Sequence, residues 1–116
     1  MKPETKFWHE LRKKTKNISW IRLENLSVPG TPDLLGYNNS GHFFTVELKY
    51  SPHQIAFHVK HPENTFVLIM QKTPSSCLIK LYEGKRIRQL VACGLTLEPL
   101  VHGMDSCLKF LSTLGA

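Results

Sequence analysis

The sequence predicts a single α/β domain, with helices packed on a mixed central sheet. Its 116 residues are enough for one hydrophobic core rather than two. Apolar residues at helical spacing alternate with short segments rich in β-branched and aromatic residues. The order is a helix, three strands, a helix, two strands and a mostly helical tail, which favours a sheet flanked by helices. The core is expected over about residues 5–82 and the tail over about 84–116.

The first half of the core begins with a predicted amphipathic helix over residues 4–16, where Phe7, Trp8 and Leu11 share one stripe. Residues 18–23 are rich in Ile, Trp and Leu and precede the turn formers Pro29 and Gly30, which indicates a strand and a loop. Residues 33–37 and 42–49 form a predicted hairpin, because the turn sequence Asn-Asn-Ser-Gly separates them.

The second half begins with a predicted helix over residues 51–60, with Ser51 as its N-cap and Pro52 at its first position. Residues 65–71 and 77–82 are predicted strands joined by a turn. In the tail, residues 86–93 are typical of a helix ended by Gly94. A second tail helix is expected over 107–114, with Asp105 as a candidate cap.

Composition limits the classes of function. A net charge of +6 and a pI near 9.4 favour polyanionic partners such as nucleic acid. The apolar stretches are far shorter than the roughly 20 residues of a membrane span, and no signal peptide is visible, so no membrane partner is expected. Three widely spaced cysteines without a Cys-x-x-Cys pair indicate buried free thiols in a reducing, cytoplasmic compartment.

The residues best suited to chemistry lie in the predicted hairpin. Side chains alternate between the faces of a strand, so Glu47 and Lys49 share one face. Asp33 starts the preceding strand, so its carboxylate can reach the end of the sheet where Glu47 lies. Mg²⁺ is commonly held by one or two carboxylates with waters and a substrate phosphate, and the backbone carbonyl of Leu48 is a further candidate ligand. A bound ion would activate water and polarise a phosphate, while Lys49 would orient that water or offset developing charge.

These residues carry a resemblance to a known family. Pro32-Asp33 followed by Glu47-Leu48-Lys49 resembles the motif of the PD-(D/E)XK nucleases, and the order of elements resembles their αβββαβ core. The chain is most similar to the VRR-NUC and Holliday-junction-resolvase-like members. Like them, it has a glycine-containing loop before the Pro-Asp pair, Glu10 on the first predicted helix, and a Ser-x-x-Gln sequence that ends at Gln54.

The resemblance implies a fold, an activity and further site residues. It implies a restriction-endonuclease-like core and a Mg²⁺-dependent DNA endonuclease, with Mn²⁺ as a substitute ion and branched or junction DNA among the candidate substrates. By the same likeness, Glu10 would be a metal ligand and Gln54 would lie near the metal pocket. A homodimer is expected by analogy with the related resolvases. No small-molecule cofactor is implied.

Basic residues outside the motif are candidate phosphate contacts. Those assigned to nucleic-acid binding are Arg12, Lys13, Lys14, Lys16, His53, Lys85, Arg86 and Arg88, with Lys80 as a further candidate. No base-reading motif is present among them.

Each candidate also has a plain structural interpretation. Asp33 fits a turn residue after proline, and Glu47 with Lys49 fits the solvated face of a half-buried strand. Glu10 fits a surface carboxylate that pairs along its helix. His53, His58 and His61 lack zinc spacing, so a polar helix face is expected for them. Trp8 and Trp20 are expected to pack in the core rather than to stack on bases.

Two other functions remain open from the sequence. One is a catalytically silent nucleic-acid-binding subunit on the same scaffold. The other is a basic α/β interaction protein in which the motif arose by chance. Magnesium-dependent cleavage of DNA separates the nuclease from both.

Overall fold

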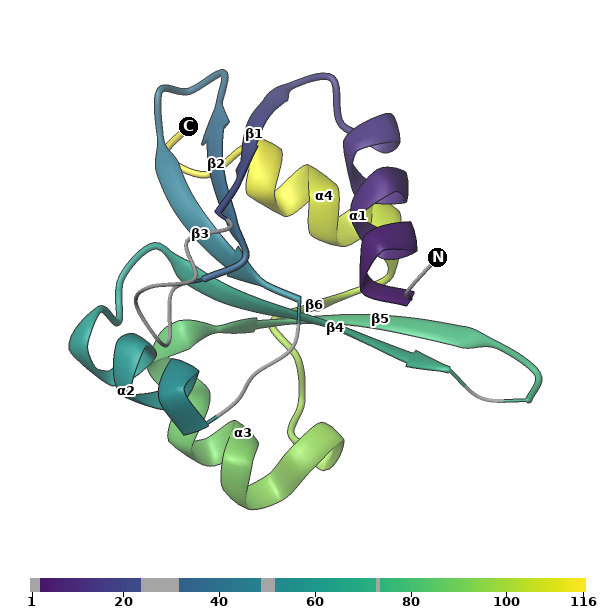
Figure 1. The fold of residues 1–116 in the computed structure, drawn as a ribbon, viewed down its shortest axis with the longest axis vertical. Helices are drawn as coiled ribbons and strands as arrows, with labels where there is room; N and C mark the ends of the chain where they lie inside the picture. The colour runs from purple at the N-terminus through teal and green to yellow at the C-terminus, as the bar shows by residue number, and fades with distance from the viewer. Residues whose placement is uncertain (1–2, 24–31, 49–51, 73) are drawn as a thin grey trace.

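The computed structural model describes residues 3–23, 32–48, 52–72 and 74–116, apart from the side chains of 3–7, 52–54 and 72. Its elements, drawn in Figure 1, are α1 (Pro3–Lys14), β1 (Ile18–Arg22), β2 (Leu34–Asn38), β3 (Phe43–Glu47), α2 (Pro52–Lys60), β4 (Thr65–Lys72), β5 (Cys77–Glu83), the 3-10 helix η1 (Gly84–Arg86), α3 (Ile87–Cys93), the 3-10 helix η2 (Gly94–Thr96), β6 (Val101–His102) and α4 (Met104–Ser112).

The described strands form one mixed sheet in the order β1-β2-β3-β4-β5-β6. β3 and β4 pair in parallel, and the other neighbours pair antiparallel. A parallel pair needs a crossover connection, which α2 supplies between β3 and β4. The predicted mixed sheet flanked by helices is therefore confirmed.

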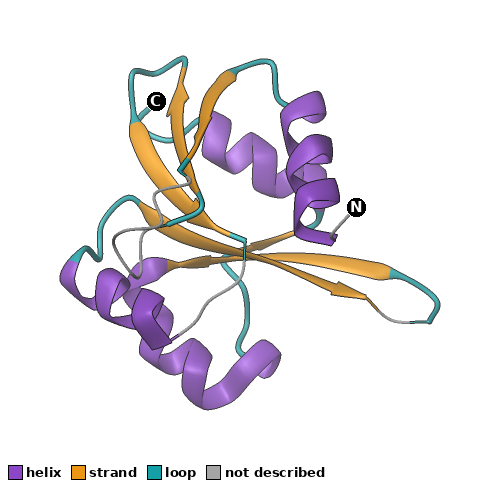
Figure 2. Ribbon diagram, viewed as in Figure 1, coloured by secondary structure: helices purple, strands orange, loops and turns teal. Residues whose placement is uncertain are grey.

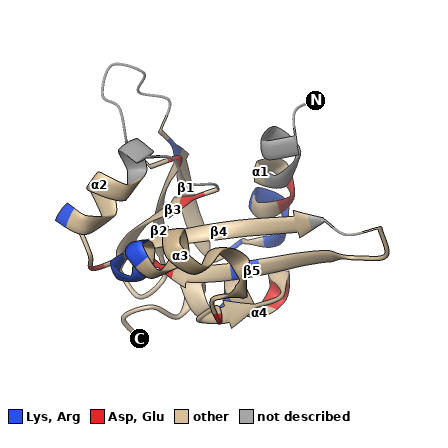
Figure 3. Cartoon of the chain, turned by 90° about the horizontal axis from the view of Figure 1, so that it is seen from below, with Lys and Arg blue, Asp and Glu red and all other residues tan. Residues whose placement is uncertain are grey.

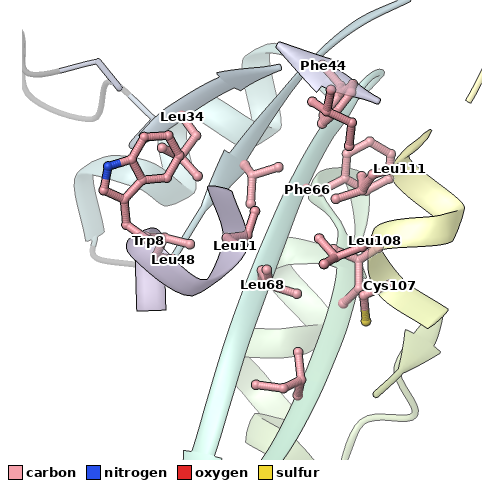
Figure 4. Close-up of a cluster of buried hydrophobic side chains, with 14 residues drawn as sticks. Trp8, Leu11, Leu34, Phe44, Leu48, Phe66, Leu68, Cys107, Leu108 and Leu111 are labelled. Carbon is pink, nitrogen blue, oxygen red and sulfur yellow. The ribbon is translucent and has the colours of Figure 1, made fainter. Parts of the chain in front are cut away.

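Helices cover both faces of this sheet. α1 and α4 lie together on one side and α2 and α3 on the other (Figures 1 and 2). The larger core is on the α1 and α4 side, where Trp8 and Leu11 meet Leu108 and Leu111 and the apolar side chains of the strands (Figure 4). Trp8 is buried and Trp20 packs against this core, as the sequence predicted. A smaller cluster on the other side joins Val67 and Tyr82 to α3.

The C-terminal tail is a part of the core that the sequence only partly predicted. β6 was not expected, and it pairs with β5 through Lys80 opposite His102 and Leu81 opposite Val101. The last helix begins at Met104 rather than at residue 107, and its N-cap is Gly103 without a side-chain cap bond. The cap expected at Asp105 is therefore wrong, and Asp105 lies in the first helical turn.

Asn38 joins this tail to the β2–β3 hairpin. Its side chain is 1% exposed, and its Nδ2 donates to the carbonyls of Leu111 and Leu114, both at 2.9 Å. Its Oδ1 accepts the backbone N–H of Ser40 and of His42. These hydrogen bonds satisfy the buried amide of Asn38. They hold the C-terminal end of the chain beside the hairpin turn, as Figure 1 shows.

The expectation for the cysteines needs a correction. Cys107 is buried, and burial raises the pKa of its thiol to about 11. Cys77 and Cys93 are free thiols like Cys107 but are exposed, because they lie at the start of β5 and the end of α3. In the described part of the chain, no helix has the length and apolar character to cross a membrane.

Gly84 is a packing requirement that the sequence did not indicate. A Cβ at this buried position would clash with Thr65 Oγ1, lie 2.6 Å from His58 Nδ1 and lie 2.9 Å from the backbone oxygen of Thr65. We expect Gly84→Ala to lower the free energy of unfolding by about 2–3 kcal/mol through overpacking. Urea denaturation at an unchanged m-value measures the difference.

Gly94→Ala is a comparison that changes backbone strain without a side-chain clash. Gly94 has φ 62° and ψ −150°, a backbone region that essentially only glycine occupies, and nothing lies within 4 Å of an added Cβ. The strain there costs about 1–3 kcal/mol. A Gly84→Ala protein as stable as the wild type would contradict the packing account.

Candidate functional site

The hairpin register brings Asp33 and Glu47 together. Leu34 pairs with Val46, so Asp33, one residue before β2, lies across from Glu47 at the end of β3. One carboxylate oxygen of Asp33 accepts the backbone N–H of Leu48 at 2.8 Å. The backbone oxygen of Asp33 accepts the N–H of Leu23, also at 2.8 Å, which anchors it to β1. Asp33 is thus a fixed part of the sheet end, rather than only a turn residue after proline.

Glu47 is fully buried beside Asp33. Its exposed fraction is 0%, so the expectation of a solvated strand face is wrong for this residue. Burial, then the negative charge of Asp33 and a hydrogen bond between the two side chains, raise the pKa of Glu47 from 4.5 to about 9. At neutral pH the metal-free pair therefore holds a proton, as expected of two carboxylates that share one site. A divalent cation is a natural replacement for that proton.

His58 is a member of the site that the sequence missed. It lies on α2 with an exposed fraction of 0%, and its Nε2 is 4.0 Å from Glu47 Oε1. Burial lowers the pKa of His58 to about 4, so the ring is neutral at pH 7. The polar helix face expected for the histidines is wrong for His58, although His61 is exposed as expected. The available signal in the sequence was that His58 lies three residues after Ile55, which is partly buried on the same helix, α2.

The strand alternation explains why these groups meet. Phe44, Val46 and Leu48 lie in the larger core with α1 and α4. Glu47 points to the opposite face, where α2 packs and brings His58 to it. Glu47 also pairs in register with Val67, a member of the smaller cluster on that side. The site therefore lies between the sheet end and α2.

The described contacts do not place several of the predicted site residues beside Asp33, Glu47 and His58. Lys49 lies outside the described residues, as do the side chains of His53 and Gln54. Glu10 is exposed on α1. Within the described ranges, no group of three His, Cys, Asp or Glu side chains is arranged to hold one metal ion. The roles of Glu10 and of the Leu48 carbonyl remain predictions.

The predicted basic residues divide between the two sides of the sheet (Figure 3). Arg12, Lys13 and Lys14 form the last turn of α1, on the side away from Glu47. Lys85, Arg86 and Arg88 lie on η1 and α3, on the side that carries Glu47 and His58.

Some of these cations already have partners within the chain. Lys85 Nζ is 3.2 Å from Glu83 Oε2, and Arg86 Nε donates to Gln89 Oε1 at 2.8 Å. Lys80 Nζ donates to the carbonyl of Leu95, which makes it a poor phosphate contact. Lys16 lines a groove of about 380 Å³ with Tyr37 and Asn38 at the turn end of the hairpin, away from Asp33.

Comparison with known proteins gave no match. No family model, no curated protein and no solved structure is similar enough to this chain to indicate a relative.

The two shifted groups predict how stability depends on pH. Folded Glu47 keeps a proton that the unfolded chain loses above pH 4.5, so its stabilising effect is lost as the pH rises toward 9. His58 acts in the opposite sense between about pH 4 and 6.5, because only the unfolded chain binds a proton on this ring there. Of these two groups, only Glu47 changes the free energy of unfolding between pH 6.5 and 9.

We therefore expect the metal-free protein to lose stability between pH 6.5 and 9, at up to about 1.4 kcal/mol per pH unit. Urea denaturation in EDTA at pH 6.5, 7.5 and 8.5 measures this slope. A free energy of unfolding that stays level or rises across the interval would contradict the buried, protonated state of Glu47.

Proposed function

We propose that this chain is a divalent-metal-dependent nuclease that hydrolyses phosphodiester bonds in DNA. The observation that carries the proposal is the fully buried Glu47 beside Asp33, with a pKa raised to about 9. Burying a carboxylate beside a second carboxylate destabilises a fold unless a proton or cation offsets their charge. Such strongly perturbed groups are typical of functional sites.

The residues present fit a magnesium or manganese ion. Asp33 and Glu47 offer the carboxylate oxygens that such hard cations prefer. When bound, the ion would activate a water and polarise the scissile phosphate. Asp33 stays oriented through the Leu48 N–H, and the buried position of Glu47 excludes bulk water from one side of the site. Lys49 directly follows Leu48 in the chain, and its proposed task is to orient the attacking water.

The arrangement of elements supports the same proposal. α1, β1, β2, β3, α2 and β4 follow the αβββαβ order of the PD-(D/E)XK nucleases, and Asp33 and Glu47 fall at the motif positions. The net charge of +6 favours a polyanionic substrate. We propose that Lys85, Arg86 and Arg88 contact the DNA backbone first, because they lie on the side of the sheet that carries Glu47.

A cleavage panel tests the function and the class of substrate. Linear, flapped and four-way DNA of matched sequence are incubated with the protein and Mg²⁺, Mn²⁺ or EDTA. We expect cleavage with either ion and none in EDTA, with branched DNA cut fastest. Absence of cleavage on every substrate with both ions would overturn the proposal.

The alternative function, a catalytically silent nucleic-acid-binding subunit, predicts a different result in the same assay. It predicts salt-sensitive DNA affinity that does not change with Mg²⁺, and no product. The chance-motif alternative predicts neither DNA binding nor metal binding.

We further propose a homodimer, because a branched substrate has two strands to cut and a small chain offers limited surface for them. Light scattering at assay concentration measures the mass directly. The mass of a monomer, both alone and on junction DNA, would contradict the dimer without affecting the proposed chemistry.

A further inference from the structure

We infer that His58 Nε2 is a nitrogen ligand of the divalent ion, opposite Glu47, an inference that rests on the metal-binding part of the proposed function. It adds a residue from α2 to a site that the motif builds from β2 and β3 alone. It also gives the site a mixed oxygen and nitrogen character.

The first observation is that His58 is buried and makes no side-chain hydrogen bond within the described part of the chain. Its side chain has an exposed fraction of 0%, and neither Nδ1 nor Nε2 has a partner among the described residues. A buried polar group left in this state costs roughly 1–3 kcal/mol, so nearly all such groups in native proteins are satisfied. A ligand that arrives from solution would satisfy the ring.

The second observation is the distance to Glu47. Nε2 lies 4.0 Å from Glu47 Oε1, beyond the range of about 2.7–3.2 Å for an N–H···O bond. Nitrogen and oxygen ligands lie roughly 2.0–2.2 Å from such ions, so two ligands on opposite sides of one ion are about 4.1 Å apart. The distance between Nε2 and Oε1 is therefore too long for a hydrogen bond and matches the separation of two ligands that bind one ion from opposite sides.

The third observation is that neighbouring residues pack against the His58 ring and fix which of its nitrogens faces Glu47. Gly84 leaves room for the ring, since a Cβ there would be 2.6 Å from His58 Nδ1. Phe57 meets the ring edge to face, with centroids 5.6 Å apart. With Nδ1 turned toward Gly84 and Thr65, Nε2 is the nitrogen that faces Glu47.

Asp33 would be the third ligand after a turn of its carboxylate, because Asp33, Glu47 and His58 do not form a three-residue metal group as they stand within the described ranges. The side chains of Asp33 and Glu47 are hydrogen-bonded to each other, which keeps the Asp33 carboxylate next to Glu47.

A nitrogen ligand has a consequence for the choice of ion. Imidazole favours first-row transition ions, whereas a site of oxygens alone suits Mg²⁺. We expect His58→Gln to weaken Mn²⁺ binding tenfold or more and to weaken Mg²⁺ binding less, so that the ratio of the two affinities falls.

Pulsed electron paramagnetic resonance of the Mn²⁺-loaded protein tests the assignment without any cleavage. We expect ¹⁴N coupling from a directly bound imidazole in the wild-type protein and in His61→Gln, and its loss in His58→Gln with Mn²⁺ still bound. His61 is the matched control, because it is an exposed histidine just after α2. Circular dichroism verifies that each variant is folded.

The other outcomes are equally decisive. Bound Mn²⁺ without ¹⁴N coupling, or coupling that persists in His58→Gln, would overturn this inference and leave the proposed function intact. Failure of the wild-type protein to bind Mn²⁺ at all would overturn both. If His58→Gln does not fold, Mn²⁺ broadening of assigned ring resonances in the wild-type protein decides, with His58 expected to broaden before the other histidines.

Discussion

Glu47→Gln is expected to lower DNA cleavage on the order of 10³-fold while making the metal-free protein more stable above pH 7. The amide keeps the size of the side chain and a hydrogen bond to Asp33, but it carries no charge for a cation. It also has no proton to lose, so the fall in stability expected between pH 6.5 and 9 disappears. Single-turnover cleavage and urea denaturation at pH 8.5 measure the two effects.

Glu63→Gln is the matched control for Glu47→Gln, because Glu63 is exposed in the turn before β4. It should leave both cleavage and the pH profile unchanged. A Glu47→Gln protein that cuts DNA at the wild-type rate would remove Glu47 from the site. Gain of stability with loss of activity is the pattern expected when a strained group serves function.

Asp33→Ala and Asp33→Asn are both expected to abolish cleavage, but only the first should destabilise the fold. Alanine removes the acceptor of the buried Leu48 N–H, which costs about 1–3 kcal/mol. Asparagine keeps an acceptor oxygen for that bond and changes stability by less than about 1 kcal/mol. Cleavage rates and urea midpoints of the two variants, measured together, separate the chemical role of Asp33 from its structural role.

Asp105→Asn provides the control, since Asp105 is an exposed carboxylate on α4. It should retain full activity. Wild-type cleavage by either Asp33 variant would show that this carboxylate is not required.

Local patterns predicted much of the fold because they report on local physics. The apolar stripe of α1 and the turn between β2 and β3 each specify structure within a few residues. Strand alternation placed Glu47 on the face opposite the core residues Val46 and Leu48, which burial confirms. Gly94 ends α3 as expected, with a φ of 62°.

The tail was harder to predict because its structure depends on distant partners. β6 has two residues and pairs with an edge of β5, so it shows no periodicity of its own. α4 begins at Met104 after the N-cap Gly103, which has no side chain to cap the helix, so the sequence holds no N-terminal signal there. Its place is set by the core and by Asn38, more than seventy residues earlier.

The site was predicted in part for the same reason. Asp33 and Glu47 lie on neighbouring strands of one hairpin, so sequence spacing was enough to bring them together. His58 joins them only because α2 crosses over the sheet, and no local pattern reports that packing. Its burial also depends on Gly84, which follows in the chain only after two further strands.

The most direct test of the central claim is calorimetric titration of Mn²⁺ into the protein at pH 7.5, in two buffers of different ionisation enthalpy. Because Glu47 is protonated at this pH, binding at the Asp33 and Glu47 pair should release about one proton per ion. We predict this release in the wild-type protein and its loss, with most of the affinity, in Glu47→Gln. Failure of the wild-type protein to bind Mn²⁺, or equal binding by Glu47→Gln, would contradict the account.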